Sequence, residues 1–167
     1  MKAPVPSRRT RRGLFVDANL LVLFTVGSVG RDRIAKFKRT SHYTVEDFDL
    51  LKKLLDENQP LLTSAHMMAE VSNLTDLKGA ELLIARNVLR LRICRVFEEP
   101  TVSSIEAADH PAFGRLGLTD AGVCEIAKRT KCRVLTDDFD LYFHLQRQGS
   151  EALNFSHIRA QSWGIED

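Results

Sequence analysis

The stretch LFVD at residues 14–17 decides the fold. Its apolar run begins after a glycine and stops at an acid, which is typical of a short buried strand. A second stretch of the same kind, RVLT at residues 133–136, is followed directly by Asp137 and Asp138. Helical patterns follow both stretches. Short apolar strands that alternate with helices indicate an α/β domain with a mainly parallel sheet.

The rest of the chain fits this alternation. Two more strands are predicted, at residues 61–63 and 152–155. Thr44, with Asp47 three residues later, has the spacing of a capping box at the start of a helix. Residues 98–118 contain two prolines and predict a loop with one helical segment. Helices are predicted over residues 18–26, 44–57, 64–77, 80–96, 120–130 and 138–148.

The chain has 167 residues, 44% of them hydrophobic and 28% charged, which suits one compact domain over residues 14–167. The net charge of +2 indicates no partner, but the charge is unevenly distributed. We interpret residues 1–13 as a flexible basic arm, which either binds nucleic-acid phosphate or serves as a solubilising tail. The arginines of this arm are Arg8, Arg9, Arg11 and Arg12.

Cysteine usage and hydropathy limit the class of protein. Cys94, Cys124 and Cys132 form no CxxC pair and are odd in number, which argues against a disulfide framework and against a zinc site. The apolar run over residues 14–26 is interrupted by polar residues and is too short to span a bilayer. The sequence therefore predicts a cytoplasmic protein with no membrane segment.

Acidic residues stand at the ends of two predicted strands. Asp17 closes the first of them, and Asp137 and Asp138 follow the strand at residues 133–136. The carboxyl ends of parallel strands form the ligand-binding edge of an open sheet. The two strands therefore bring carboxylates to one edge, provided that they are neighbours. The alternative for each aspartate is that it only caps the helix that follows.

Glu70 lies on the apolar face of its predicted helix, between Leu74 and Leu77 on a helical wheel. A glutamate among core positions either pairs with a buried base or binds a cation at the open edge of the core. Arg86 and Arg90 are the candidate bases. Asp120 shows the same pattern more weakly, because an acid in the first turn of a helix also complements the helix dipole.

Four carboxylates in one pocket repel each other unless a cation offsets their charge. Because carboxylate oxygens without His or Cys ligands favour Mg²⁺ or Mn²⁺, the cluster predicts a site for one of these ions. Carboxylate-held divalent ions are a known means of phosphodiester cleavage. Asn19 and Thr136 lie within two residues of the strand-end acids, where their polar groups could orient a carboxylate.

The sequence resembles the PIN-domain ribonuclease family. Four segments carry the resemblance, in the order that the family has them, and together with their spacing they extend over residues 14–155. They are FVDANLL at residues 15–21, SAHMMAEVSNL at 64–74, GLTDAGVCEIAK at 117–128 and VLTDDFDLY at 134–142.

The resemblance implies a Rossmann-like three-layer α/β/α domain with a mainly parallel central sheet. It also implies an endoribonuclease that cleaves single-stranded RNA with Mg²⁺ or Mn²⁺. Asp17, Glu70 and Asp120 match the first three acids of the family, and Thr136 with Asp138 matches its last motif. Asp137 and Asp140 remain alternatives for the fourth acid. The catalytic and metal-binding residues that the resemblance implies are thus Asp17, Glu70, Asp120 and Asp138.

Many bacterial relatives are VapC-like toxins with a small antitoxin partner, and many form homodimers. For this chain the helix at residues 80–96 is the candidate dimer surface by analogy. The chain differs from compact toxins in its basic arm and in its extra length at residues 31–43 and 98–116. The alternative to an enzyme is a catalytically silent PIN-like module that binds RNA or protein.

Phe139, Tyr142 and Phe143 alternate with acidic and polar residues. Exposed aromatic side chains at such positions could stack on the bases of a single strand. The pattern favours packing of the last predicted helix in the core instead.

Overall fold

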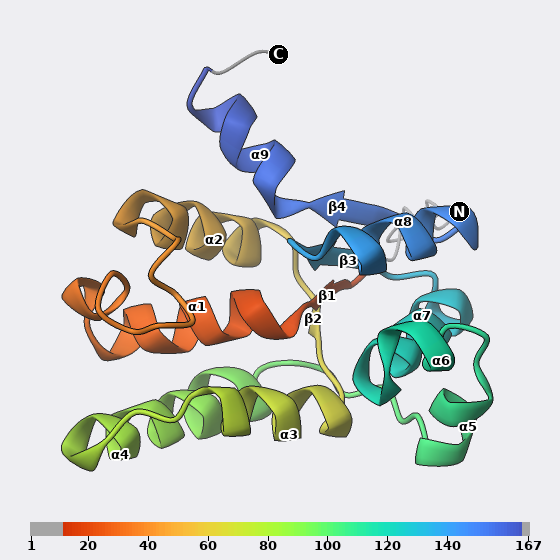
Figure 1. Ribbon diagram of the computed structural model, residues 1–167, viewed down its shortest axis with the longest axis horizontal. Helices are drawn as coiled ribbons and strands as arrows, with labels where there is room; N and C mark the ends of the chain where they lie inside the picture. The colour runs from red at the N-terminus through yellow and green to blue at the C-terminus, as the bar shows by residue number, and fades with distance from the viewer. Residues whose placement is uncertain (1–11, 165–167) are drawn as a thin grey trace, which may run out of the picture.

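The fold is an α/β domain built on four parallel strands, seen in a computed structural model that describes residues 12–164 (Figure 1). The strands are β1 (Leu14–Val16), β2 (Leu61–Leu62), β3 (Arg133–Thr136) and β4 (Ala152–Asn154). They lie in the order β2-β1-β3-β4, with every pairing parallel. The α/β class and the parallel sheet that the sequence predicts are therefore confirmed.

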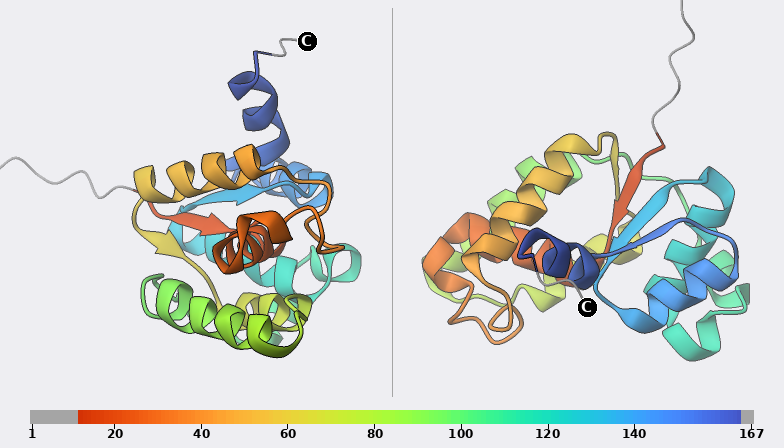
Figure 2. Two further views of the ribbon diagram at one scale, coloured as in Figure 1. Left: turned by 90° about the vertical axis from the view of Figure 1, so that its left-hand side faces the viewer. Right: turned by 90° about the horizontal axis from the view of Figure 1, so that it is seen from above.

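Helices lie on both sides of this sheet (Figure 2). All helices named here lie within residues 12–164. In that part of the chain, no helix is long and apolar enough to cross a membrane. The helices are α1 (Ala18–Val29), the 3₁₀ turn η1 (Arg31–Arg33), α2 (Val45–Glu57), α3 (Ala65–Leu74), α4 (Gly79–Val88), the π-helical turn η2 (Leu89–Cys94), α5 (Ser104–Asp109), α6 (Phe113–Leu116), α7 (Leu118–Thr130), α8 (Phe139–Arg147) and α9 (Phe155–Ser162).

Helix α1 continues from β1 into the middle of the molecule, with α2 on one side and α3 and α4 on the other (Figure 1). Every residue from Leu20 to Gly27 is buried, so the helix has no polar face. A helix that is apolar all round is stable only when neighbours cover all of it. At Gly27 a β-carbon would overlap the ring of Phe48, so this glycine lets α1 and α2 approach closely.

The register of the sheet sets the position of the strand-end residues. Val16 pairs with Leu135, and the N–H of Asp17 donates to the Leu135 carbonyl at 3.0 Å. β1 and β3 are thus neighbours, and Asp17 lies beside Thr136. The sequence placed the strand-end acids at one edge provided that their strands are neighbours, and the structure meets that condition.

Several predicted boundaries were wrong. Helix α3 ends at Leu74, three residues early, because Thr75 closes it by hydrogen bonds from its N–H and its hydroxyl to the Val71 carbonyl. Residues 98–118 contain two short helices instead of one. Helix α9 was not predicted: it begins at Phe155, which the sequence assigned to a strand, because Asn154 caps it.

The packing of α8 also differs from the prediction. Leu141 and Leu145 are the residues of this helix that are fully buried, whereas Phe139 and Phe143 are 49% and 47% exposed. Their rings stack on each other with centroids 6.2 Å apart. The prediction that these two aromatic side chains pack in the core was therefore wrong.

Candidate active site

Asp17 occupies the carboxyl end of β1, where it is 5% exposed. The N–H of Ala18 donates to its Oδ1 at 2.6 Å, so Asp17 caps α1 as well as ending the strand. The Thr136 hydroxyl donates to its Oδ2 at 2.5 Å. One carboxylate oxygen is thus held by the first N–H of α1 and the other by the neighbouring strand β3, where Thr136 orients Asp17 as the sequence suggested.

Asp138 follows β3 and caps α8, because its Oδ1 accepts from the N–H groups of Asp140 and Leu141 at 2.7 and 3.1 Å. Its own N–H donates to the Thr136 hydroxyl at 2.9 Å. The same hydroxyl therefore fixes the two strand-end acids, Asp17 and Asp138, relative to each other. Asp140 is exposed and pairs with Arg115.

Glu70 and Asp120 come from α3 and α7, which pack against each other. Both side chains are half-buried. Neither of the bases considered as partners for Glu70 reaches it: Arg86 donates to Ser72, and Arg90 to Asn87 at 3.2 Å. Within residues 12–164 none of the four acids forms an ion pair with a base.

Electrostatic repulsion connects Asp120 with each of the other three acids. The pKa of Asp17 is raised to about 8, mainly by burial and then by the charge of Asp120, against the opposing hydrogen bonds from Thr136 and Ala18. The pKa of Asp120 is raised to about 7, mainly by burial and then by the charges of Asp138 and Glu70. Burial and neighbouring negative charge therefore oppose ionisation of Asp17 and Asp120.

Asp137 is held by Asn19 in the first turn of α1 and by Tyr43 in the segment that precedes α2. Its Oδ2 accepts a hydrogen bond from the Tyr43 hydroxyl, and its Oδ1 accepts one from Asn19 Nδ2 at 3.5 Å. Burial raises the pKa of Asp137, while the hydrogen bond from Asn19 and the charge of His42 lower it. Both of its oxygens are engaged, so Asp137 anchors the segment that carries Tyr43.

A divalent cation fits this donor set on chemical grounds. The four acids offer only hard carboxylate oxygens, and their repulsion is what such a cation relieves. In the described chain no three acidic, histidine or cysteine side chains already surround one point as ligands. Asp17 and Asp138 instead accept hydrogen bonds from the backbone N–H groups that begin α1 and α8.

Tyr43 and His42 were not identified from the sequence. Tyr43 is buried, and the His42 ring lies over it with centroids 4.0 Å apart. The signal that could have found them is the cluster of bases in the extra segment at residues 31–43, which the sequence analysis noted only as added length. A tyrosine next to a histidine in such a segment has no local pattern that reveals a contact with residue 137.

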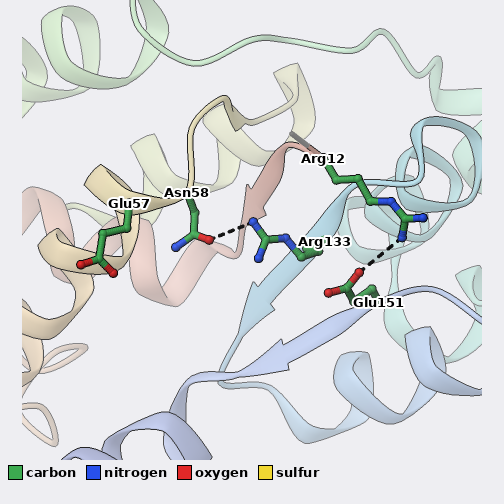
Figure 3. Close-up of a pocket in the computed structure, with 5 residues that line it drawn as sticks. All are labelled: Arg12, Glu57, Asn58, Arg133 and Glu151. Carbon is green, nitrogen blue, oxygen red and sulfur yellow. Dashed lines mark hydrogen bonds and ion pairs between the residues drawn. The ribbon is translucent and has the colours of Figure 1, made fainter. Parts of the chain in front are cut away.

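The described part of the basic arm lies at the opposite edge of the sheet. Arg12 pairs with Glu151 at 3.5 Å beside Arg133, which donates to Asn58 at 2.8 Å, and these residues surround a pocket at the amino ends of the strands (Figure 3). Arg12 is therefore not brought to the acids. Arg8, Arg9 and Arg11 lie outside the described residues.

Comparison with known proteins adds no assignment to this geometry. No model of a known protein family matches the chain, and no curated protein matches it either.

Proposed function

We propose that the chain is a divalent-metal-dependent ribonuclease of the PIN-domain type that hydrolyses phosphodiester bonds in single-stranded RNA. One observation supports the proposal: Asp17 and Asp138 lie at the carboxyl edge of the parallel sheet, the charges of Glu70 and Asp138 act on Asp120 and that of Asp120 acts on Asp17, and within residues 12–164 no base pairs with any of the four acids. This edge is where open α/β sheets bind ligands. The order of the acids along the chain is also that of the family the sequence resembles.

The chain's own groups have distinct roles in this proposal. Asp17, Glu70, Asp120 and Asp138 would hold Mg²⁺ or Mn²⁺. Thr136 is a positioning residue, because its hydroxyl donates to Asp17 and accepts from the Asp138 N–H. A divalent cation bound to the four acids would lower the pKa of water and offset charge on the phosphate.

Asp137 and Asp140 have other roles than metal binding in this proposal. The first anchors Tyr43 and Asn19, and the second forms an exposed ion pair with Arg115. Asp138 is thereby preferred as the fourth acid, because its Oδ2 is not used in capping α8.

Removal of the metal tests the activity directly. The purified chain is incubated with a mixed pool of single-stranded RNA in Mn²⁺, in Mg²⁺ or in EDTA. We expect cleavage with either ion, none in EDTA, and recovery when Mn²⁺ is restored in excess. Equal cleavage in EDTA, or none under any condition, would overturn the proposal, and the latter result together with RNA binding would favour the catalytically silent module.

Whether the nuclease acts as the toxin of an antitoxin pair depends on its partner. We propose the exposed apolar residues of α4, Leu83 and Ile84, as the surface through which a homodimer would form. Leu83 is 67% exposed and Ile84 is 46% exposed. A short reading frame for an antitoxin directly upstream would favour a toxin over a housekeeping nuclease.

A further inference from the structure

A basic pocket lies next to the acids, between α1 and the segment that joins it to α2. It has a volume of about 610 Å³, within the range of about 300 to 1,000 Å³ usual for sites that bind small ligands. Three of its lining residues are bases and one is an acid. The six residues are Asn19, Phe37, Lys38, Arg39, His42 and Asp76.

The bases of this pocket differ from the other bases of the same segment. Arg31 pairs with Asp49 at 2.6 Å, Lys36 pairs with Asp32 at 2.8 Å, and Arg33 pairs with Glu81. These three bases are engaged by the fold itself. Within residues 12–164, no acid lies within ion-pair distance of the other two, Lys38 and Arg39.

The pocket is linked to the segment that carries Asp138 by two hydrogen bonds to Asp137. Asn19 lines it and donates to Asp137, the neighbour in sequence of Asp138. His42 also lines it and lies over Tyr43, whose hydroxyl donates to the same aspartate. The side chains of Asn19 and Tyr43 therefore link the basic pocket to Asp137, at the carboxyl end of β3.

We infer that this basic pocket binds the phosphate backbone of single-stranded RNA beside the phosphodiester bond that the acids cleave. The inference rests on the proposed function, because it names the substrate contacts of the same site. A cluster of carboxylates repels a polyanion, and adjacent unpaired bases offset that repulsion. Phe37 is half-buried at the pocket and offers a ring face for one base of the strand.

The variant Lys38→Ala/Arg39→Ala tests the inference. Binding of a labelled pool of short single-stranded RNA is measured by fluorescence anisotropy in EDTA, over a range of salt from about 50 to 200 mM. Each phosphate contact with a single strand makes the slope of log K against log salt steeper by about 0.7. The variant loses two such contacts, so the magnitude of its slope should be smaller by about 1.4. We expect its Kd to rise about tenfold at the lowest salt.

Two controls make the result specific. Lys53→Ala/Arg95→Ala removes the same charge from exposed positions on α2 and at the end of η2, and should change the slope little. Lys38→Arg/Arg39→Lys keeps both charges in the pocket and should retain the slope. The melting temperature of each variant shows that it is folded.

The outcomes separate this inference from the proposed function. A larger KM with little change in kcat, together with the lower slope, supports the pocket. If RNA binding falls as expected but no variant or parent cleaves RNA, the pocket stands and the nuclease proposal fails. The inference would be overturned if the pocket variant and the Lys53/Arg95 control had equal slopes, or if the parent bound no RNA. It would also be overturned if the parent bound duplex RNA more tightly than single-stranded RNA and the pocket variant lost affinity for both equally.

Discussion

Replacing Asp17 with asparagine is expected to lower the rate of RNA cleavage in Mn²⁺ by at least about 10³-fold. Loss of cation-mediated charge stabilisation costs several kcal/mol of barrier, and about 4 kcal/mol corresponds to that factor. The side chain keeps its size and its hydrogen bond from Ala18, but its amide nitrogen does not accept from the Thr136 hydroxyl, so the variant removes the negative charge together with that hydrogen bond. Single-turnover cleavage of a labelled RNA pool measures it.

The matched control is Asp140→Asn, a change of the same kind in the segment that carries Asp138. Asp140 is exposed and pairs only with Arg115, so this variant loses a surface ion pair and should retain most of its activity. An Asp17→Asn variant as active as the parent would remove this carboxylate from the proposed machinery. A large loss in Asp140→Asn instead would move the fourth acid from Asp138 to Asp140.

The metal-free protein is expected to lose stability as the pH rises from about 4 to 8. The pKa of Asp17 is about 8 in the folded protein, above its ordinary value of 3.8, and that of Asp120 is raised to about 7. Between these values the unfolded chain has released the protons that the folded protein still binds. Their contribution to stability is complete below about pH 4 and is lost as the pH rises through the folded pKa values.

Asp17→Asn and Asp120→Asn remove this loss, because an amide has no proton to release. In EDTA at pH 8 each variant should melt at a higher temperature than the parent. For Asp17→Asn the expected increase is roughly 5 to 10 °C, which corresponds to a few kcal/mol of destabilisation by the ionised carboxylate in the parent. At pH 4 the difference should be small. Thermal melts across this pH range measure the difference. An Asp17→Asn variant that melts below the parent at pH 8 would show that the ionised Asp17 carboxylate does not destabilise the folded protein.

The strand ends were predictable because a buried strand leaves a local pattern. An apolar run that stops at an acid placed Asp17 and Asp138 correctly at the ends of β1 and β3, and only their adjacency required the sheet order. The capping box of Thr44 and Asp47 was equally local and is confirmed. Features set within a few residues can be recognised from those residues alone.

Features set by distant contacts could not be predicted in this way. The central position of α1 depends on α2, α3 and α4 together, and its sequence shows only that it is apolar. The contact of Tyr43 with Asp137 joins residues 94 positions apart. Glu70 and Asp120 were both candidates from the sequence, but their proximity depends on the packing of α3 against α7, which no local pattern reveals.

Binding of Mn²⁺ to the metal-free protein tests the central claim most directly. Isothermal titration calorimetry at pH 8 compares the parent with Asp17→Asn, Asp120→Asn and the control Asp140→Asn. The four-acid site predicts that Mn²⁺ binds the parent and the control alike and that each of the other two variants binds it at least about tenfold more weakly. Equal binding of Mn²⁺ by all four proteins would contradict the claim that Asp17, Glu70, Asp120 and Asp138 form a metal site.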